Sequence, residues 1–216
     1  MKICLFGAAS ELIDTGYMDR VEALGEMLAK HGHTMVFGAG GTGLMGAAAR
    51  GIKRVGGRVI GVIPEFFRKE AVEVIFDDCD DIIYTDSMRE RKRVMEDEAE
   101  AFLITPGGIG TFEEFFEVLT LKQLGRHKKP IAIYNINGYF NGLCDLMDNA
   151  INGRFLNKEC RNLYLISDNT EEIFDYIRRS EEHTSELFDY IENEEHFGYN
   201  ILELKTSFNK KEEDQQ

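Results

Sequence analysis

The sequence predicts a doubly wound α/β fold, in which a parallel β-sheet is covered by helices on both faces. Three observations support this prediction: short apolar runs recur along the first 167 residues, segments of helical periodicity lie between them, and two glycine-rich stretches directly follow apolar runs. Uninterrupted apolar strands are typical of parallel sheets that are buried on both faces. In such folds, ligands bind at the carboxyl ends of the strands.

Each expected strand is rich in β-branched or aromatic residues. We expect strands at residues 2–7, 34–38, 58–63, 81–85, 101–105, 131–135 and 163–167. The segments between them have the apolar spacing of helices. In the segment that precedes the second strand, Val21, Leu24, Met27 and Leu28 fall on one helical stripe. Alternation of strands and helices is what a parallel sheet with crossover helices requires.

The composition favours one domain with an acidic C-terminal extension. A chain of 216 residues with 43% hydrophobic content can bury one large core, which we place at residues 1–180. Residues 169–195 have helical periodicity. Residues 181–216 hold 11 acidic and three basic side chains and therefore eight of the 14 net negative charges. We expect this extension to be partly helical, with a disordered end.

Composition also argues against several classes of partner. A net charge of −14 does not suit general binding to nucleic acid, whose phosphates require a basic surface. No run of 18 apolar residues is present, so we expect no membrane span. The cysteines are far apart and the first residues lack the features of a signal peptide, which favours the cytoplasm. Neither the cysteine nor the histidine spacing indicates a metal site, and we expect no cofactor.

The most informative stretch is TPGGIGTFEEFFE, residues 105–117, which follows the fifth expected strand. Gly107, Gly108 and Gly110 form a turn into a helix, where backbone N–H groups and the helix dipole favour a phosphate. A tight turn without a ligand is the alternative, but such a turn rarely requires three glycines. We expect the helix to begin at Gly110 or Thr111, with the Thr111 hydroxyl as a further donor or a cap.

A second glycine-rich stretch, GAGGTGLMGAAARG, follows the second expected strand at residues 38–51. Gly41, Gly43 and Gly46 spell G-x-G-x-x-G, and Glu65 follows about 20 residues later, as in dinucleotide sites. That fingerprint normally follows the first strand, which argues against a dinucleotide site here. A loop that binds a nucleoside triphosphate would need lysine and a hydroxyl residue after its last glycine, and this stretch has neither there. Two glycine loops favour one small phosphorylated ligand between them. A nicotinamide-dependent oxidoreductase is the rival hypothesis.

The third stretch, TDSMRERKRVMEDE, covers residues 85–98 and is basic in a markedly acidic protein. Ser87 is a natural N-cap, and Met88 and Lys92 share one face of the helix that it would begin. Arg91 and Lys92 fall one turn into this helix, at the carboxyl end of a strand. A solvated helix face would explain some of these charges. We expect at least one of the two cations to contact a phosphate or carboxylate.

The stretches GAGGTGLMG, SMRERK and PGGIGTFEE together resemble the signature blocks of the LOG family, in the order and spacing of that family, over about residues 2–177. The resemblance implies a Rossmann-like homodimer that hydrolyses the N-glycosidic bond of an adenine-type nucleoside 5′-monophosphate, N6-prenylated or not. The products would be the free base and ribose 5-phosphate. The resemblance also implies that Arg91 and Glu114 form the catalytic pair.

Two positions depart from the family pattern. Arg89 stands where the family has a histidine, and the early block reads Gly7-Ala8-Ala9 instead of Gly-Ser-Ser. Both blocks line the nucleotide site in the family, so the resemblance places Gly7, Met88 and Lys92 near the substrate. Gly41 and Gly43 belong to the glycine loop after the second strand, which we expect to contact the same ligand. A non-catalytic nucleotide or cofactor carrier on the same fold is a further alternative.

The residues fit this chemistry independently of the resemblance. Breaking the C1′–N9 bond develops positive charge on the ribose, which a carboxylate can stabilise while it aligns a water molecule. Glu114 lies one turn past Gly110, at about the length of a ribose from a phosphate on the loop. Arg91 could keep Glu114 ionised or contact the ribose. The ordinary alternative is a salt bridge at a helix start.

The same helix also predicts a homodimer. Apolar side chains surround much of its circumference, namely Phe112, Phe115, Phe116, Leu119 and Leu121. One stripe can face the sheet, and the remaining apolar surface is of the kind that marks an interface. The alternative is that the C-terminal extension, around Leu187 and Phe188, covers this surface within one chain.

Overall fold

The computed structural model describes residues 1–70 and 74–182 and has the predicted fold, a seven-stranded parallel sheet with helices on both faces. All seven expected strands form: β1 (Lys2–Phe6), β2 (Thr34–Phe37), β3 (Arg58–Pro64), β4 (Asp81–Thr85), β5 (Ala101–Ile104), β6 (Ile131–Tyr134) and β7 (Leu165–Ser167). The α-helices are α1 (Thr15–Lys30), α2 (Gly43–Arg54), α3 (Glu65–Glu70), α4 (Met88–Glu98), α5 (Ile109–Gln123), α6 (Asn141–Asn152) and α7 (Thr170–Glu182). Two short 3₁₀ helices are η1 (Ile136–Gly138) and η2 (Lys158–Leu163).

The strand order is β4-β3-β2-β1-β5-β6-β7, so the direction of winding reverses between β1 and β5. Ile3 pairs with Met35 of β2 on one side and with Ala101 of β5 on the other. The helices that follow β1 and β5 pack on opposite faces of the sheet, which opens a crevice at the carboxyl ends of these two strands. Ligands of doubly wound folds bind at this kind of position.

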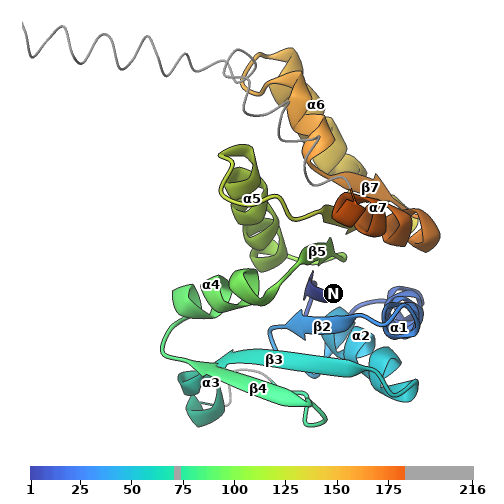
Figure 1. Cartoon of the computed structure of the whole chain (residues 1–216), viewed down its shortest axis with the longest axis vertical. Helices are drawn as coiled ribbons and strands as arrows, with labels where there is room; N and C mark the ends of the chain where they lie inside the picture. The colour runs from blue at the N-terminus through green and yellow to red at the C-terminus, as the bar shows by residue number, and fades with distance from the viewer. Residues whose placement is uncertain (71–73, 183–216) are drawn as a thin grey trace, which may run out of the picture.

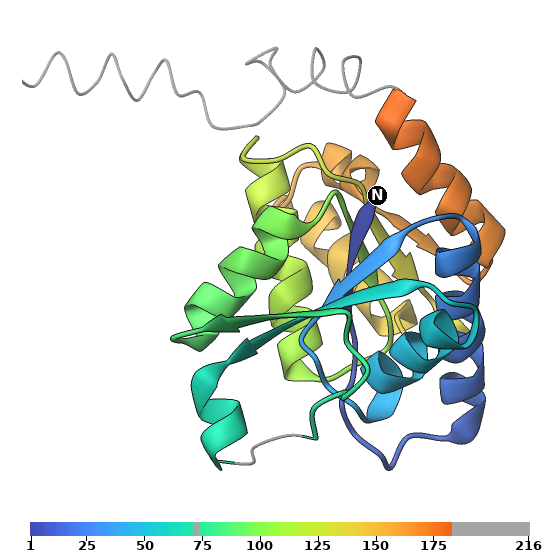
Figure 2. The ribbon, with the colours of Figure 1, turned by 60° about the horizontal axis from the view of Figure 1, so that its bottom comes forward.

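Helices α1, α2 and α7 cover one face of the sheet, and α4, α5 and α6 cover the other (Figures 1 and 2). Alternate residues of each strand therefore point into two separate cores. In β1, Ile3 and Leu5 pack with α1 and α2, whereas Cys4 and Phe6 pack with α4 and α5. Burial on both faces explains why the strands are apolar without interruption.

The helical pattern at residues 169–195 is found in the described part as α7, which packs through Ile173, Phe174 and Ile177. The rest of that pattern, most of the acidic extension, and Leu187 and Phe188 lie outside the described residues. Within the described residues, no helix is long and apolar enough to cross a membrane.

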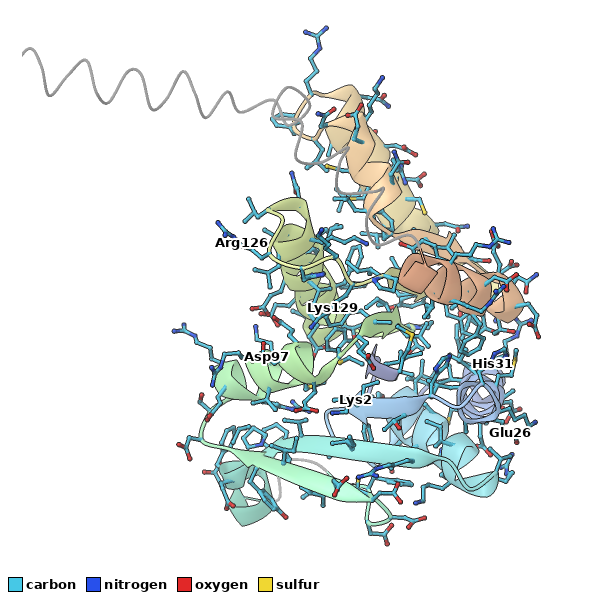
Figure 3. All side chains as sticks on the ribbon, viewed as in Figure 1. Lys2, Glu26, His31, Asp97, Arg126 and Lys129 are labelled. Carbon is cyan, nitrogen blue, oxygen red and sulfur yellow. The ribbon has the colours of Figure 1, made fainter. Side chains whose placement is uncertain are left out.

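Helices α4 and α5 both begin at the carboxyl edge of the sheet and run back to its amino edge. Figure 3 labels Lys2, Asp97 and Lys129, which lie at that amino edge near the far ends of these helices. There, the Lys129 Nζ atom donates a hydrogen bond of 2.6 Å to the Glu96 carbonyl. The loop after α5 is thus held against the end of α4, whereas the first turns of both helices lie at the crevice.

Candidate functional site

The loop after β5, residues 105–110 (the β5 loop), leads directly into α5. The helix begins at Ile109 with Gly108 as its N-cap, and no side chain caps it. The prediction that it begins at Gly110 or Thr111 was wrong, because Gly108 takes an extended conformation and Ile109 already continues the helix. Thr111 is therefore not a cap. Its side chain is buried against Gly107, where a Cβ atom would overlap the hydroxyl.

The first N–H groups of α5 are not taken up by the backbone of the described residues. The first helical hydrogen bond runs from the Phe112 N–H to the Gly108 carbonyl, over 3.0 Å. Among the described residues, the N–H groups of Ile109, Gly110 and Thr111 have no backbone acceptor. A Cβ atom at Gly108 or Gly110 would meet nothing within 4 Å, so packing does not require glycine at either position. An open helix N-terminus of this kind favours an anion.

A cavity of about 300 Å³ adjoins the β5 loop at the crevice between β1 and β5. Its walls are Ala8, Ser10, Ile13, Tyr17, Pro106, Gly107, Gly108 and Tyr139. The Tyr139 hydroxyl donates a hydrogen bond of 2.6 Å to the Gly107 carbonyl and so fixes the loop from one side. The Tyr17 and Tyr139 rings meet edge to face, with centroids 6.4 Å apart. The cavity gives a small ligand access to the β5 loop.

The loop after β2, residues 38–46 (the β2 loop), is closed by the protein itself. The Gly41 N–H donates to the Val74 carbonyl over 2.7 Å, and the Leu44 N–H, at the start of α2, donates to the Ala8 carbonyl over 2.8 Å. Gly43 has a φ of 58°, and a Cβ atom there would overlap the Ala8 carbonyl. These glycines have structural reasons that do not involve a dinucleotide, which weakens the nicotinamide hypothesis. Contacts of Gly41 and Gly43 with substrate stay a prediction.

Gly7 allows the ends of β1 and β5 to lie close together. A Cβ atom at Gly7 would overlap the hydroxyl of Thr105, which donates to the Phe6 carbonyl over 3.1 Å. The next residue, Ala8, donates its N–H to the Pro106 carbonyl over 3.1 Å. Gly7 thus shapes the base of the crevice, beside the β5 loop.

Arg91 extends from α4 across the carboxyl ends of β2 and β3. Its side chain is 7% exposed. Nε donates to the Val62 carbonyl over 3.1 Å, and Nη2 donates to the Gly38 carbonyl over 2.7 Å. The guanidinium carbon lies 5.4 Å from the centre of the Phe67 ring. A Cβ atom at Gly38 would overlap the guanidinium, so glycine at this position lets Arg91 occupy its place.

The start of α4 is as predicted, because the Ser87 hydroxyl accepts a hydrogen bond from the Glu90 N–H over 3.2 Å. Lys92 binds two carboxylates of α5, Glu113 and Glu117, the latter at 2.6 Å. Its ammonium therefore joins α4 to α5, and contact with a substrate stays a prediction. Met88 is 41% exposed, and its sulfur lies 3.8 Å from Nη1 of Arg91.

Glu114 lies on the first turns of α5, on the side that faces α4. Burial raises its pKa from 4.5 to about 7, although Arg91 and Lys92 act in the opposite direction. Arg91 therefore offsets the burial only in part, and at neutral pH the carboxyl group is close to half ionised. Glu113, one residue earlier, is exposed and binds Lys92. A carboxyl group that titrates near neutrality beside a buried arginine is suited to proton transfer.

Known protein families include a clear match to this chain. Residues 45–177 match the family described as possible lysine decarboxylase, which is more than half of the chain. The chain belongs to the LOG family. A probable cytokinin riboside 5′-monophosphate phosphoribohydrolase of Oryza sativa subsp. japonica is 33% identical over 176 residues, 82% of each chain. A cytokinin riboside 5′-monophosphate phosphoribohydrolase of Arabidopsis thaliana is 33% identical over 182 residues, 84% of this chain and 82% of the relative.

Solved structures share the fold of this LOG family member at lower identity. The molybdenum cofactor carrier protein of Chlamydomonas reinhardtii has a TM-score of 0.63 at 19% identity, over 84% of this chain and 98% of the carrier. A molybdenum cofactor binding protein of Rippkaea orientalis has a TM-score of 0.59 at 19% identity, over 82% of this chain and 94% of that chain. At these identities the likeness extends to the fold alone.

The structure brings together most of the residues that the sequence singled out, and it adds four. Arg91 and Glu114 lie on facing helices, and the β5 loop lies at the start of the second one. Sequence reasoning missed Tyr139, Phe67 and the carbonyls of Gly38 and Val62. The tyrosine follows a turn marked by Asn-Gly, which was a usable signal. The other three contacts depend on the path of one arginine side chain.

Proposed function

We propose that this protein hydrolyses the N-glycosidic bond of an adenine-type nucleoside 5′-monophosphate, N6-prenylated or not, to the free base and ribose 5-phosphate. The observation that carries the proposal is the position of Glu114, whose carboxyl group is close enough to the buried Arg91 for its charge to lower the pKa, and which follows the N–H groups at the start of α5 by one helical turn. The activities for which the relatives from rice and Arabidopsis are named support the same reaction.

The β5 loop is the proposed phosphate site. Neutral backbone donors at a helix N-terminus bind a phosphate without a cationic side chain, and Gly108 and Gly110 let it approach the backbone closely. From there, one helical turn leads to Glu114, so a ribose held by its 5′-phosphate brings C1′ near the carboxylate. Binding of the phosphate fixes the sugar for the reaction at its other end.

In the proposed reaction, the oxygen of a water molecule bonds to C1′ while the C1′–N9 bond breaks. One proton of the water passes to the Glu114 carboxylate and then to solvent. The base leaves with the bonding electrons and takes up a proton from solvent. The ionised carboxylate also stabilises the positive charge that develops on the ribose. Arg91 holds the ionised fraction of Glu114 higher than burial alone would allow.

The proposal is tested by incubating the pure protein with a panel of nucleoside 5′-monophosphates and resolving the free bases by chromatography. The panel includes AMP, N6-prenylated AMP, GMP and CMP, and adenosine is the control without phosphate. We expect release of base from an adenine nucleotide and very slow release from adenosine, because the donors of the β5 loop would then lack a partner. Adenosine cleaved as fast as AMP would remove the β5 loop from the mechanism.

Binding of AMP without release of base would favour the carrier alternative. The structural likeness to molybdenum cofactor carriers extends to the fold alone and does not decide between the two functions. Equilibrium binding measured beside the activity assay separates a carrier, which binds and does not cleave, from an enzyme. A nicotinamide enzyme would instead show a change in absorbance or fluorescence with NAD(H).

We also propose that the protein is a homodimer built on α4 and α5. Phe115 and Leu119 face the core, whereas Ile109 is 87%, Leu124 63% and Phe116 36% exposed on α5. Met88, on α4, is 41% exposed. Exposed apolar side chains on neighbouring helices are typical of an interface. Light scattering should give about twice 24.6 kDa for the full chain. After deletion of residues 181–216 it should give twice the mass of the shortened chain. A monomeric mass for the full chain would contradict the dimer.

A further inference from the structure

The guanidinium of Arg91 is held on three sides by groups that do not touch the proposed substrate. Two are backbone carbonyls at the ends of strands, Val62 on Nε and Gly38 on Nη2. The third is the ring of Phe67, on the short helix α3 that follows β3. The ring centre is 5.4 Å from the guanidinium carbon, within the range of a cation–π contact.

The ring has a different effect on the arginine from that of the carbonyls. Two hydrogen bonds fix one edge of the planar guanidinium. Nη1, at the other edge, lies 3.8 Å from the Met88 sulfur, a weak contact that opposes rotation of the plane about the first edge only slightly. A ring packed against the plane limits this rotation. Phe67 is itself rigid, because it is 8% exposed and packs with Ala39 and Ile63. Its face is also shielded from water, which strengthens the contact with a cation.

We infer that Phe67 is a positioning residue for Arg91, and that it keeps the guanidinium in the place from which its charge acts on Glu114. This inference rests on the proposed hydrolase function, in which Arg91 and Glu114 act as a pair. Without the ring, the guanidinium can turn about its two hydrogen bonds and draw away from the carboxyl group. The strands and α4 stay in place, because the carbonyls of Val62 and Gly38 still hold the arginine.

A change in the position of Arg91 has a measurable consequence at Glu114. The charged groups that act on this carboxyl group are Arg91 and Lys92, which lower its pKa, and Glu113 and Glu117, which raise it. On the β1 side lies the Cys4 thiol, which stays neutral because burial and nearby carboxylates raise its pKa well above its usual value. A more distant Arg91 lowers the pKa of Glu114 less, so the carboxylate forms at higher pH.

The experiment compares the pH profile of base release in wild type, Phe67→Leu and Phe67→Tyr. Phe67→Leu should release base about tenfold more slowly, as expected for a displaced catalytic group, and the rise in activity should move to higher pH. Phe67→Tyr keeps the ring and should restore the wild-type profile. Phe76→Leu is the matched control. Phe76 is about equally buried, at 9% exposure, but packs against Phe37 in the core beneath α1 and α2. It should lose stability without a shift of the profile.

A second comparison separates positioning from general damage. In an Arg91→Ala background, Phe67→Leu should cause no further loss of activity, because the group that it positions is gone. Gly38→Ala, whose methyl group displaces the guanidinium, should reproduce the shift if Phe67→Leu does not fold. An unshifted profile in both variants, or an equal loss with and without Arg91, would overturn the inference. An inactive wild type would instead overturn the proposed function, because the inference concerns only differences from an active wild type.

Discussion

The β2 loop and the β5 loop are alike in sequence and differ in what lies against their glycines. Each follows a buried strand, contains three or more glycines and leads into a helix. In the β2 loop, the protein itself fills the space and accepts the hydrogen bonds. The Ala8 carbonyl accepts from the Leu44 N–H, and the missing side chain of Gly43 leaves room for this carbonyl. In the β5 loop, Gly108 and Gly110 border open space. A glycine that packing explains needs no ligand, whereas a glycine that packing leaves unexplained is evidence for one.

The largest effect is expected at the carboxylate that follows the open loop. Glu114→Gln should reduce base release about a hundredfold or more, because an amide can neither accept the proton of water nor stabilise positive charge on the ribose. Glu113→Gln is the matched control one residue away, and it should lose only the ion pair with Lys92. Circular dichroism should show both variants folded. Full activity in Glu114→Gln would leave the β5 loop as a binding site without catalysis.

The pH dependence of base release should follow the ionisation of Glu114. Because its pKa is raised to about 7, Glu114 is protonated below neutrality and ionised above it. Activity that needs the carboxylate should therefore increase with pH up to about 8, and at pH 5 it should be about a hundredth of its maximum. Initial rates of base release between pH 5 and pH 9 measure this, with folding checked at each pH. A profile flat from pH 5 to pH 8 would contradict a role for ionised Glu114.

Alanine substitutions should have different effects in the two loops, on stability in the β2 loop and on KM in the β5 loop. Gly43→Ala places a side chain at a φ of 58° and against the Ala8 carbonyl, which should cost at least about 1–2 kcal/mol of unfolding free energy. The melting temperature should then fall by roughly 4 °C or more. Gly110→Ala should leave stability unchanged or slightly higher, since alanine favours the helix. Its methyl group should nevertheless raise KM about tenfold by obstructing the phosphate.

Thermal unfolding and steady-state kinetics of both variants test this difference together. A Gly110→Ala protein with wild-type KM would show that no ligand approaches the β5 loop closely. A Gly43→Ala protein with wild-type stability would show that the β2 loop is less tightly packed than its contacts indicate.

The sequence was sufficient for the strands and for the edge of the sheet at which the candidate site lies, for a definite physical reason. A parallel strand buried on both faces has to be apolar throughout, so a run such as AFLIT, residues 101–105, could hardly be anything else. The order of the motifs then placed Arg91 and Glu114 at the same edge of the sheet. The start of α5 was misplaced by one or two residues, because a threonine is a common cap and Gly108 gives no side-chain signal.

The sequence could not show which backbone N–H groups are hydrogen-bonded within the protein. Nothing in the letters distinguishes the Leu44 N–H, which donates to Ala8, from the Gly110 N–H, which has no acceptor among the described residues. The raised pKa of Glu114 likewise depends on burial between two helices rather than on its neighbours in the chain. The contact of Phe67 with Arg91 joins residues 24 positions apart through a side chain whose path no periodicity encodes.

The smallest effect is expected from two hydroxyl groups, one on each loop. Tyr139 donates to the Gly107 carbonyl of the β5 loop over 2.6 Å, and Thr42 of the β2 loop donates to the Ala9 carbonyl over 2.6 Å. Each hydrogen bond should contribute about 1 kcal/mol. Thr42→Val should therefore lower only the melting temperature, whereas Tyr139→Phe should also raise KM about threefold, because it loosens the loop that holds the phosphate. Tyr139→Phe removes one oxygen atom, and Thr42→Val replaces a hydroxyl with a methyl group of similar size. Because each variant loses one hydrogen bond, a difference between their KM values reports on the β5 loop. Equal KM values would mean that the β5 loop is held without Tyr139 and that its open donors are fixed by the helix alone.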